Sequence, residues 1–179
     1  KEQGGKFVFG MEESHGFLMG NHSGDKDGIW ASMAFAEMAA ALKENKLTPI
    51  DRLNQIYQQY EVHLDALGTQ TFKGTKGMAK IQQIMRELRN SPPESVAGQA
   101  VVKITDYLEN KIICGNETRQ GPGLPQSNVI ALELADNSRI TARPSGTEPK
   151  IKYYFNLQGK DSEMLNRRLA SIQADFIKD

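Results

Sequence analysis

The sequence predicts a mixed fold: an α/β segment followed by a small α+β domain with an antiparallel sheet and helices. Three observations predict it. The first part of the chain follows a short apolar strand with long helical patterns, and the last part contains several short strands separated by tight turns. Between them, Pro92 and Pro93 stop a helix. We therefore expect two domains, residues 1–92 and residues 93–179.

The N-terminal part is expected to be mainly helical. Residues 6–10 read as a short buried strand, followed by a glycine-rich, turn-rich stretch up to residue 28. A helix is expected over 28–44, capped by Asp25 or Asp27, with inward positions that include Ile29 and Met33. Thr48 and Pro49 open a second helix as N-cap and first residue. A short strand at 69–72 and a third helix over 75–89 follow.

The C-terminal part is expected to form the antiparallel sheet. Strands are predicted at 100–105 and 128–134, and the turn at 136–138 leads into a hairpin strand at 139–143. In the strand at 150–157, apolar side chains alternate with polar ones. Ile151, Tyr153 and Phe155 share one face, and Lys150, Lys152 and Tyr154 share the other. A closing helix over 161–177 has its apolar stripe at Met164, Leu165, Leu169, Ile172 and Phe176.

Composition excludes several classes of function. The net charge is zero, which argues against broad binding to nucleic acids or anionic membranes. A single cysteine, Cys114, forbids an intrachain disulfide and fits a reducing, cytoplasmic setting. Its apolar neighbours favour a buried or strand-end thiol over a nucleophile. Neither a membrane-spanning run nor a signal peptide is evident.

One loop carries the strongest chemical signal. Residues 143–149 read Arg-Pro-Ser-Gly-Thr-Glu-Pro between two predicted strands. Arg143 offers a planar fork for phosphate oxygens, and Ser145 and Thr147 add hydroxyls. Gly146 can adopt a positive φ, which would let neighbouring amides converge on an anion. The residues alone leave two interpretations open, a phosphate-binding loop or an ordinary surface turn. The pattern is not a Walker loop.

A second polar cluster follows the first predicted strand. Glu12, Glu13, Ser14 and His15 lie at its carboxyl end, where open α/β sheets bind ligands. A carboxylate beside a hydroxyl suits the vicinal hydroxyls of a sugar, although a solvated loop is the alternative. His15 is either a general base or an exposed loop histidine.

Metal sites are not expected. Asp25 and Asp27 begin a faintly calcium-like run, but positions five and twelve fall on Ile29 and Ala36, which cannot ligate calcium through their side chains. The histidines lack the spacing of zinc ligands.

These clusters, in this order, resemble the α-D-phosphohexomutase superfamily, the group of phosphoglucomutases and phosphomannomutases. The resemblance covers most of the chain and is carried by residues 12–16, 25–28 and 143–152. Residues 124–129 also resemble its phosphoglucomutase/phosphopentomutase-like branch. The resemblance makes phosphate binding the expected role of the arginine loop.

In this family the third domain binds the hydroxyl groups of the sugar, and the fourth domain binds the phosphate of the substrate that does not react. The sugar-binding residues implied here are Glu12, Ser14 and Lys26. The phosphate-binding residues implied are Arg143, Ser145, Gly146 and Thr147.

The departures from the family pattern are also informative. The chain contains neither the serine loop that is phosphorylated in the family's first domain nor the Asp-rich loop that holds Mg²⁺ in its second. It starts without Met, so we expect a C-terminal fragment: the end of a truncated third domain and the whole fourth domain. Gly24 stands where related enzymes often have Arg. His15 precedes Gly16, so the role of a family histidine that follows the glycine is not transferred.

The resemblance implies a parent enzyme that interconverts sugar 1-phosphate and sugar 6-phosphate. A phosphoserine donates its phosphoryl group, a sugar 1,6-bisphosphate forms and reorients, and Mg²⁺ assists. The fragment would bind a phosphorylated sugar, lack mutase activity without the missing N-terminal domains, and self-associate through an exposed strand edge at residues 6–10. A phosphopentomutase parent and a standalone phosphosugar-binding module are the alternatives. The sequence does not decide between glucose, mannose and a pentose.

Overall fold

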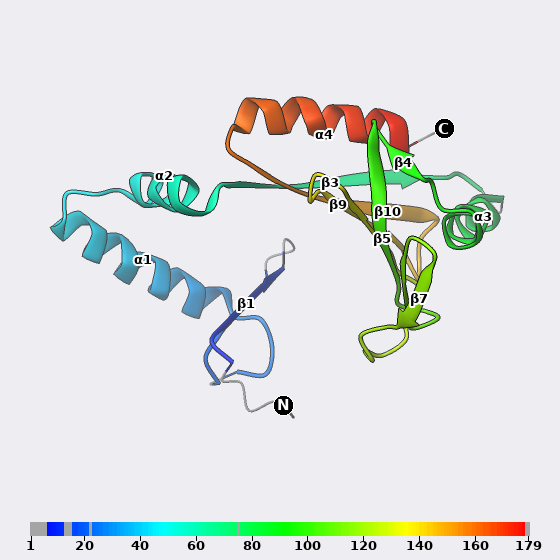
Figure 1. Ribbon diagram of the computed structural model, residues 1–179. Helices are drawn as coiled ribbons and strands as arrows, with labels where there is room; N and C mark the ends of the chain where they lie inside the picture. Colours follow the sequence, from blue (N-terminus) through cyan, green and yellow to red (C-terminus); the bar gives the residue numbers. More distant parts are fainter. Residues whose placement is uncertain (1–6, 13–15, 22, 75, 178–179) are drawn as a thin grey trace. The chain divides into compact units, whose positions relative to one another are not determined.

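A computed structural model describes residues 7–12, 16–21, 23–74 and 76–177 (Figure 1). The chain divides into two compact units, Lys1–Gln59 and Tyr60–Asp179. Each unit is described by itself below.

The first unit contains a hairpin and two helices. Strand β1 (Phe9–Glu12) pairs antiparallel with β2 (Gly16–Met19), so that Glu12 lies opposite Gly16. Helix α1 (Gly28–Glu44) and most of α2 (Pro49–Tyr60) follow. The strand expected at 6–10 is therefore wrong in position. The stretch that was expected to form turns contains β2. This strand was missed because Gly16 begins it and Gly20 directly follows it, and glycines are typical of turns.

Both helix starts use the expected side chains. The Asp27 carboxylate accepts hydrogen bonds from the backbone N–H groups of Ile29 and Trp30, so Asp27 and not Asp25 caps α1. At α2 the capping is reciprocal: Asp51 N–H donates to the Thr48 hydroxyl at 3.1 Å, and Thr48 N–H donates to the Asp51 carboxylate at 2.8 Å. These bonds satisfy amides that would otherwise lack partners at a helix N-terminus.

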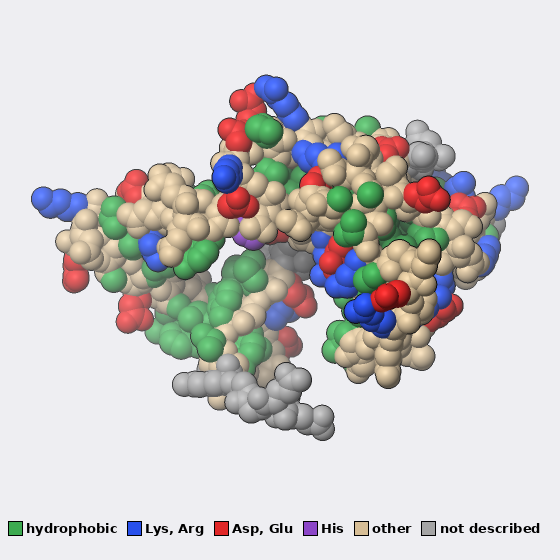
Figure 2. Space-filling model, viewed as in Figure 1, with side chains coloured by type: hydrophobic (Ala, Val, Ile, Leu, Met, Phe, Trp, Pro, Cys, Tyr) green, Lys and Arg blue, Asp and Glu red, His purple; other side chains and the backbone are tan. Residues whose placement is uncertain are grey.

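Helix α1 does not bury the apolar side chains that were expected to point inward. It has no buried residue, and Ile29 and Met33 are 78% and 60% exposed. Figure 2 shows hydrophobic side chains gathered over α1 and the β1–β2 hairpin. The expectation failed because the spacing identifies an apolar face but not what covers it.

The second unit is built on an antiparallel sheet of eight strands in the order β3-β10-β9-β8-β5-β6-β7, with β4 paired to β5. Its strands are β3 (Val62–Thr71), β4 (Ser95–Val96), β5 (Gln99–Asp106), β6 (Lys111–Cys114), β7 (Glu117–Gln120), β8 (Ile130–Leu134), β9 (Arg139–Pro144) and β10 (Lys150–Gly159). The predicted β8–β9 hairpin is confirmed, and Cys114 ends a strand. The β6–β7 hairpin was not predicted, because its polar second strand has no apolar alternation.

Two helices pack on the sheet. Helix α3 (Lys76–Asn90) contacts β8, β9 and β10, and α4 (Ser162–Phe176) contacts β3, β4 and β10 (Figure 1). The core between helices and sheet includes Ile81, Met85, Ile151, Phe155 and Ile172, none more than 2% exposed. The predicted inward face of β10 is thus confirmed.

Tyr153 belongs to this core, whereas Met164 does not. Burial raises the pKa of Tyr153 to about 12, and its hydroxyl donates to the Gln70 side chain at 3.2 Å. Met164, expected on the inward stripe of α4, is 69% exposed, so that expectation was wrong. It lies at the third residue of the helix, where the inward face is already provided by Leu165.

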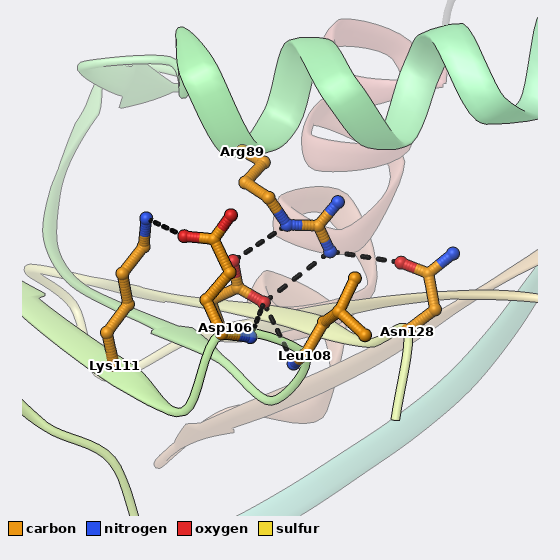
Figure 3. Close-up of polar contacts among 6 residues, drawn as sticks. Arg89, Asp106, Leu108, Lys111 and Asn128 are labelled. Carbon is orange, nitrogen blue, oxygen red and sulfur yellow. Dashed lines mark hydrogen bonds and ion pairs between the residues drawn. The ribbon is translucent and has the colours of Figure 1, made fainter. Parts of the chain in front are cut away.

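A buried ion pair fastens α3 to the sheet (Figure 3). Arg89 Nε donates to Asp106 Oδ2 at 2.7 Å, and the two side chains are 10% and 2% exposed. The same carboxylate accepts from the backbone N–H groups of Leu108 and Glu109. Arg89 also donates to Asn128 at 3.0 Å. The network joins the end of α3, the turn after β5 and the segment that enters β8.

The boundary between the two compact units lies at 59/60, which is 33 residues before the expected domain boundary at 92/93. The cause is β3, which pairs through all ten of its residues with β10 and so belongs to the second unit together with α3. The assignment of family domains to residues 1–92 and 93–179 stays a prediction.

Candidate functional site

The loop between β9 and β10 borders a cavity of about 280 Å³. Its lining residues come from the end of β9, the loop itself and the start of β10. They are Arg143, Pro144, Ser145, Gly146, Glu148, Lys150, Lys152 and Tyr154. Three of the implied phosphate-binding residues, Arg143, Ser145 and Gly146, are therefore brought together in one place.

The loop is held in shape by its own hydrogen bonds. Ser145 N–H donates to the Lys150 carbonyl at 2.9 Å, which closes the loop between the two strands. The Ser145 hydroxyl oxygen accepts from the backbone N–H groups of Thr147 and Glu148, at 3.4 and 3.2 Å. The serine thus orders the turn, and its hydroxyl hydrogen remains available to an oxygen ligand.

Gly146 has a different role from the one expected. Its φ is not positive, so the argument from left-handed backbone does not apply. A Cβ added at Gly146 would meet no atom within 4 Å, and the residue lines the cavity. Glycine here keeps the mouth of the cavity clear of a side chain, which allows a ligand to approach the backbone.

The cavity carries an excess of positive charge. Arg143 and Lys152 are directly paired residues of β9 and β10, so their side chains project from the same face of the sheet. Lys150 lies two residues before Lys152 and forms an ion pair with Glu148. Three cations therefore face one carboxylate, an arrangement that suits a dianion.

Besides Pro144 and Glu148 of the loop itself, sequence reasoning left three lining residues of β10 out of the site. Lys150, Lys152 and Tyr154 were assigned to the face of β10 opposite the core, but their nearness to Arg143 depends on the β9–β10 register, which spacing alone does not supply. Thr147, which was expected in the site, is exposed and lies outside the cavity lining.

The implied sugar-binding residues belong to the first unit. Lys26 Nζ lies 3.0 Å from Glu12 Oε2, so these two are brought together. Gly16 is buried between them: an added Cβ would lie 2.5 Å from Lys26 Cδ and 2.9 Å from Glu12 Cβ. The loop leading to α1 is anchored by Asp27 N–H, which donates to the Phe17 carbonyl at 2.7 Å. Ser14 and His15 lie outside the described residues.

Within residues 7–12, 16–21, 23–74 and 76–177, no group of three or more His, Cys, Asp and Glu side chains is placed to hold a metal ion. None of the helices in this part of the chain has the length and apolar character needed to span a bilayer.

Comparison with known proteins supports the resemblance. The family model described as phosphoglucomutase/phosphomannomutase, alpha/beta/alpha domain III, matches residues 1–60. The phosphoglucomutase of Staphylococcus aureus strain MRSA252 is 37% identical over 163 residues, which are 90% of this chain and 29% of that protein. The phosphoglucomutase of strain USA300 is 40% identical over 152 residues, 84% of this chain and 27% of that protein.

The fold is also shared with a solved structure. The open form of pp63/parafusin, a phosphoglucomutase from Paramecium, superposes with a TM-score of 0.56 at 20% identity, over 90% of this chain and 30% of that one. The chain spans less than a third of the length of these relatives. The sequence identity, the family model and the shared fold agree, and the chain belongs to the α-D-phosphohexomutase superfamily of phosphoglucomutases and phosphomannomutases.

Proposed function

We propose that this chain supplies the phosphate-binding and sugar-binding parts of an enzyme that interconverts sugar 1-phosphates and sugar 6-phosphates. The cavity beside Arg143 is the observation that carries the proposal, because it combines a guanidinium, two ammonium groups and an ordered serine hydroxyl. Such a set binds a phosphate dianion through charge-assisted hydrogen bonds.

In this proposal each cavity residue has a simple task. Arg143 binds two phosphate oxygens with its planar fork, and Lys152, directly opposite on β10, neutralises the remaining charge. Ser145 keeps the loop in shape and offers its hydroxyl hydrogen. Glu148 holds Lys150 at the rim. The loop therefore positions the end of the substrate that does not react.

The second cluster is proposed to read the sugar. Glu12 and Lys26 already pair at 3.0 Å, so an acceptor and a donor are presented side by side. Vicinal sugar hydroxyls can bond to both at once, and near-symmetric contacts would accept the sugar in two orientations. Ser14 is the third residue proposed for this cluster.

The reacting end is proposed to lie on other parts of the parent protein. A phosphoserine would donate the phosphoryl group, a sugar 1,6-bisphosphate would form and reorient, and Mg²⁺ would stabilise charge. We assign no step of that transfer to residues of this chain. Because phosphoryl transfer depends mainly on positioning and charge stabilisation, a loop that only holds the distal phosphate still contributes to the rate.

The 179-residue chain alone is accordingly expected to have no mutase activity. A coupled assay that converts glucose 6-phosphate formed from glucose 1-phosphate into NADPH measures this directly. Turnover that survives repurification and disappears in Arg143→Ala would contradict the proposal that the reacting groups lie elsewhere.

Self-association is proposed for the first unit. Met33 and Phe35 on α1 are 60% and 57% exposed, and apolar surface of this kind favours contact with another chain. Sedimentation velocity over a range of concentrations tests this. A single monomeric species at the highest concentration would rule it out.

The proposed ligand class is tested by ligand-observed NMR with a panel of compounds on the intact chain. Glucose 1-phosphate, glucose 6-phosphate, mannose 6-phosphate and ribose 5-phosphate should bind, and unphosphorylated glucose should not. The ranking within the panel begins to identify the sugar. Equal binding of glucose and glucose 6-phosphate would refute a phosphate-directed site.

A further inference from the structure

The lining of the cavity beside residues 143–149 includes one aromatic side chain, whose surface on the sheet adjoins an exposed leucine. On β10, Tyr154 lines the cavity two residues beyond Lys152 and points to the same face. Residues two apart on a strand are separated by roughly 7 Å. The tyrosine ring would therefore lie next to a phosphate bound by Lys152.

The neighbours of Tyr154 extend this surface. Tyr154 is paired with Leu67 on β3 and with Thr141 on β9, and both partners share its face of the sheet. Leu67 lies on the edge strand of the sheet and is 45% exposed, so its apolar side chain can be reached by a ligand. Both helices α3 and α4 pack against the opposite face of β10, through Ile151, Tyr153 and Phe155.

The two consecutive tyrosines of β10 show the contrast. Tyr153 is 2% exposed, contacts the Phe176 ring edge-on and donates a hydrogen bond to Gln70. Tyr154 is only partly buried and borders the cavity. Part of the Tyr154 side chain is therefore available to a ligand, whereas the Tyr153 ring is used by the core.

We propose that Tyr154 and Leu67 form a shelf that binds the carbon skeleton attached to the phosphate, so that this site prefers a sugar phosphate to inorganic phosphate. The inference rests on the proposed function, since it requires the phosphate to lie beside Arg143 and Lys152. A sugar ring presents C–H groups on one face, and these pack on an aromatic ring or a leucine side chain by the same burial of apolar surface that stabilises protein cores.

The test compares two ligands on the 179-residue chain, inorganic phosphate and glucose 6-phosphate, by protein-observed NMR titration. The wild-type chain is expected to bind glucose 6-phosphate about fivefold more tightly, the effect of covering roughly 40 Å² of apolar surface. Tyr154→Ala is expected to remove most of this preference while changing phosphate binding by less than about twofold. Tyr154→Phe should retain the preference, because the ring and not the hydroxyl makes the contact.

A second variant keeps the test valid if Tyr154→Ala does not fold. Leu67→Ala truncates an exposed side chain and is expected to reduce the preference by about twofold, since it removes less apolar area. Tyr60→Ala and Leu124→Ala are matched controls, because these side chains are 58% and 57% exposed and lie outside the cavity lining. They should leave both affinities unchanged.

The outcomes separate this inference from the proposed function. Phosphate binding that is lost in Arg143→Ala, together with no preference for glucose 6-phosphate in the wild type, overturns the shelf and leaves the phosphate site standing. An equal loss of both ligands in Tyr154→Ala also overturns it. If neither ligand binds to the folded wild-type chain, the phosphate site fails and the shelf fails with it.

Discussion

Arg143 of β9 and Lys152 of β10 are directly paired across two adjacent antiparallel strands, and both line the cavity at the end of these strands. The pairing matters because like charges directly opposite each other destabilise a sheet. Here the positively charged side chains of Arg143 and Lys152 lie side by side and line the same cavity. An anionic ligand bound beside both side chains would lower this repulsion, which is consistent with the proposed phosphate site.

We predict that Lys152→Gln weakens the binding of glucose 6-phosphate by a few-fold and makes the remaining affinity less sensitive to salt. A partly exposed ion pair contributes up to about 1 kcal/mol, or roughly fivefold in affinity, and salt screens it. Calorimetry at low and high ionic strength measures both effects. Lys160→Gln is the matched control, since Lys160 is exposed and lies outside the cavity lining; the same loss in that variant would remove the argument for Lys152.

The stability of the second unit should fall in acid through Asp136. Burial alone would raise the pKa of this carboxyl, but hydrogen bonds from Ser138 and Arg168 and the charge of Arg168 outweigh it and hold the pKa below 3.8. Because the folded value is the lower one, the stabilisation is present above pH 3.8 and is lost as the pH falls through the folded pKa. Urea unfolding at a series of pH values should show a shallower acid loss for Asp136→Asn than for the wild type. An unchanged slope, relative to the surface control Glu163→Gln, would contradict this.

The buried pair of Figure 3 should be far more sensitive to substitution than an exposed one. Asp106→Ala is expected to cost about 3–5 kcal/mol of unfolding free energy, because it leaves the Arg89 guanidinium uncompensated at 10% exposure. Glu163→Ala, which breaks an exposed pair with Arg167 on α4, should cost less than about 1 kcal/mol.

The double variant Arg89→Met with Asp106→Leu refines that prediction. It should recover much of the loss, since replacing both charges by apolar groups removes the stranded charge. Chemical denaturation of the four proteins measures each value. A double variant as unstable as Asp106→Ala would show that the hydrogen bonds to Leu108 and Glu109, and not the ion pair, dominate.

Gly16→Ala should disrupt the Glu12–Lys26 pair. The added methyl group would lie 2.5 Å from Lys26 Cδ and 2.9 Å from Glu12 Cβ, so at least one of these side chains must move. A cost of about 1–3 kcal/mol is typical of such overpacking. Gly24→Ala is the control, because a Cβ there meets no atom within 4 Å. Thermal unfolding followed in the first unit, with chemical shifts of Lys26 as a second readout, compares the two. Equal behaviour of both variants would refute the steric argument.

The sequence predicted local structure well wherever the signal was itself local. Asp27 and Thr48 capped the helices that their positions indicated, and alternation correctly divided the side chains of β10 between two faces. It predicted less where the outcome depended on distant pairing. The full length of β3 became evident only from its partner β10, because Gly68 interrupts its apolar alternation, and the unit boundary moved with it.

The candidate site shows the same limit. The loop motif indicated Arg143, Ser145, Gly146 and Thr147, and all but Thr147 line the cavity. The reason given for Gly146 was wrong, since the residue keeps space open and does not adopt a positive φ. Lys152 and Tyr154 could be placed in the site only once the register of β9 and β10 was known.

The measurement that tests the central claim most directly is the dissociation constant of glucose 6-phosphate for the wild-type chain and for Arg143→Ala and Arg143→Lys, with Arg167→Ala as the exposed control. Loss of hydrogen bonds to a charged group of this kind costs about 1.5–3 kcal/mol, so Arg143→Ala should bind roughly 10- to 100-fold more weakly. Arg143→Lys should recover only part of the loss, because an ammonium lacks the bidentate fork. If the folded Arg143→Ala chain binds glucose 6-phosphate as tightly as the wild type, this loop is not the phosphate site and the account is wrong.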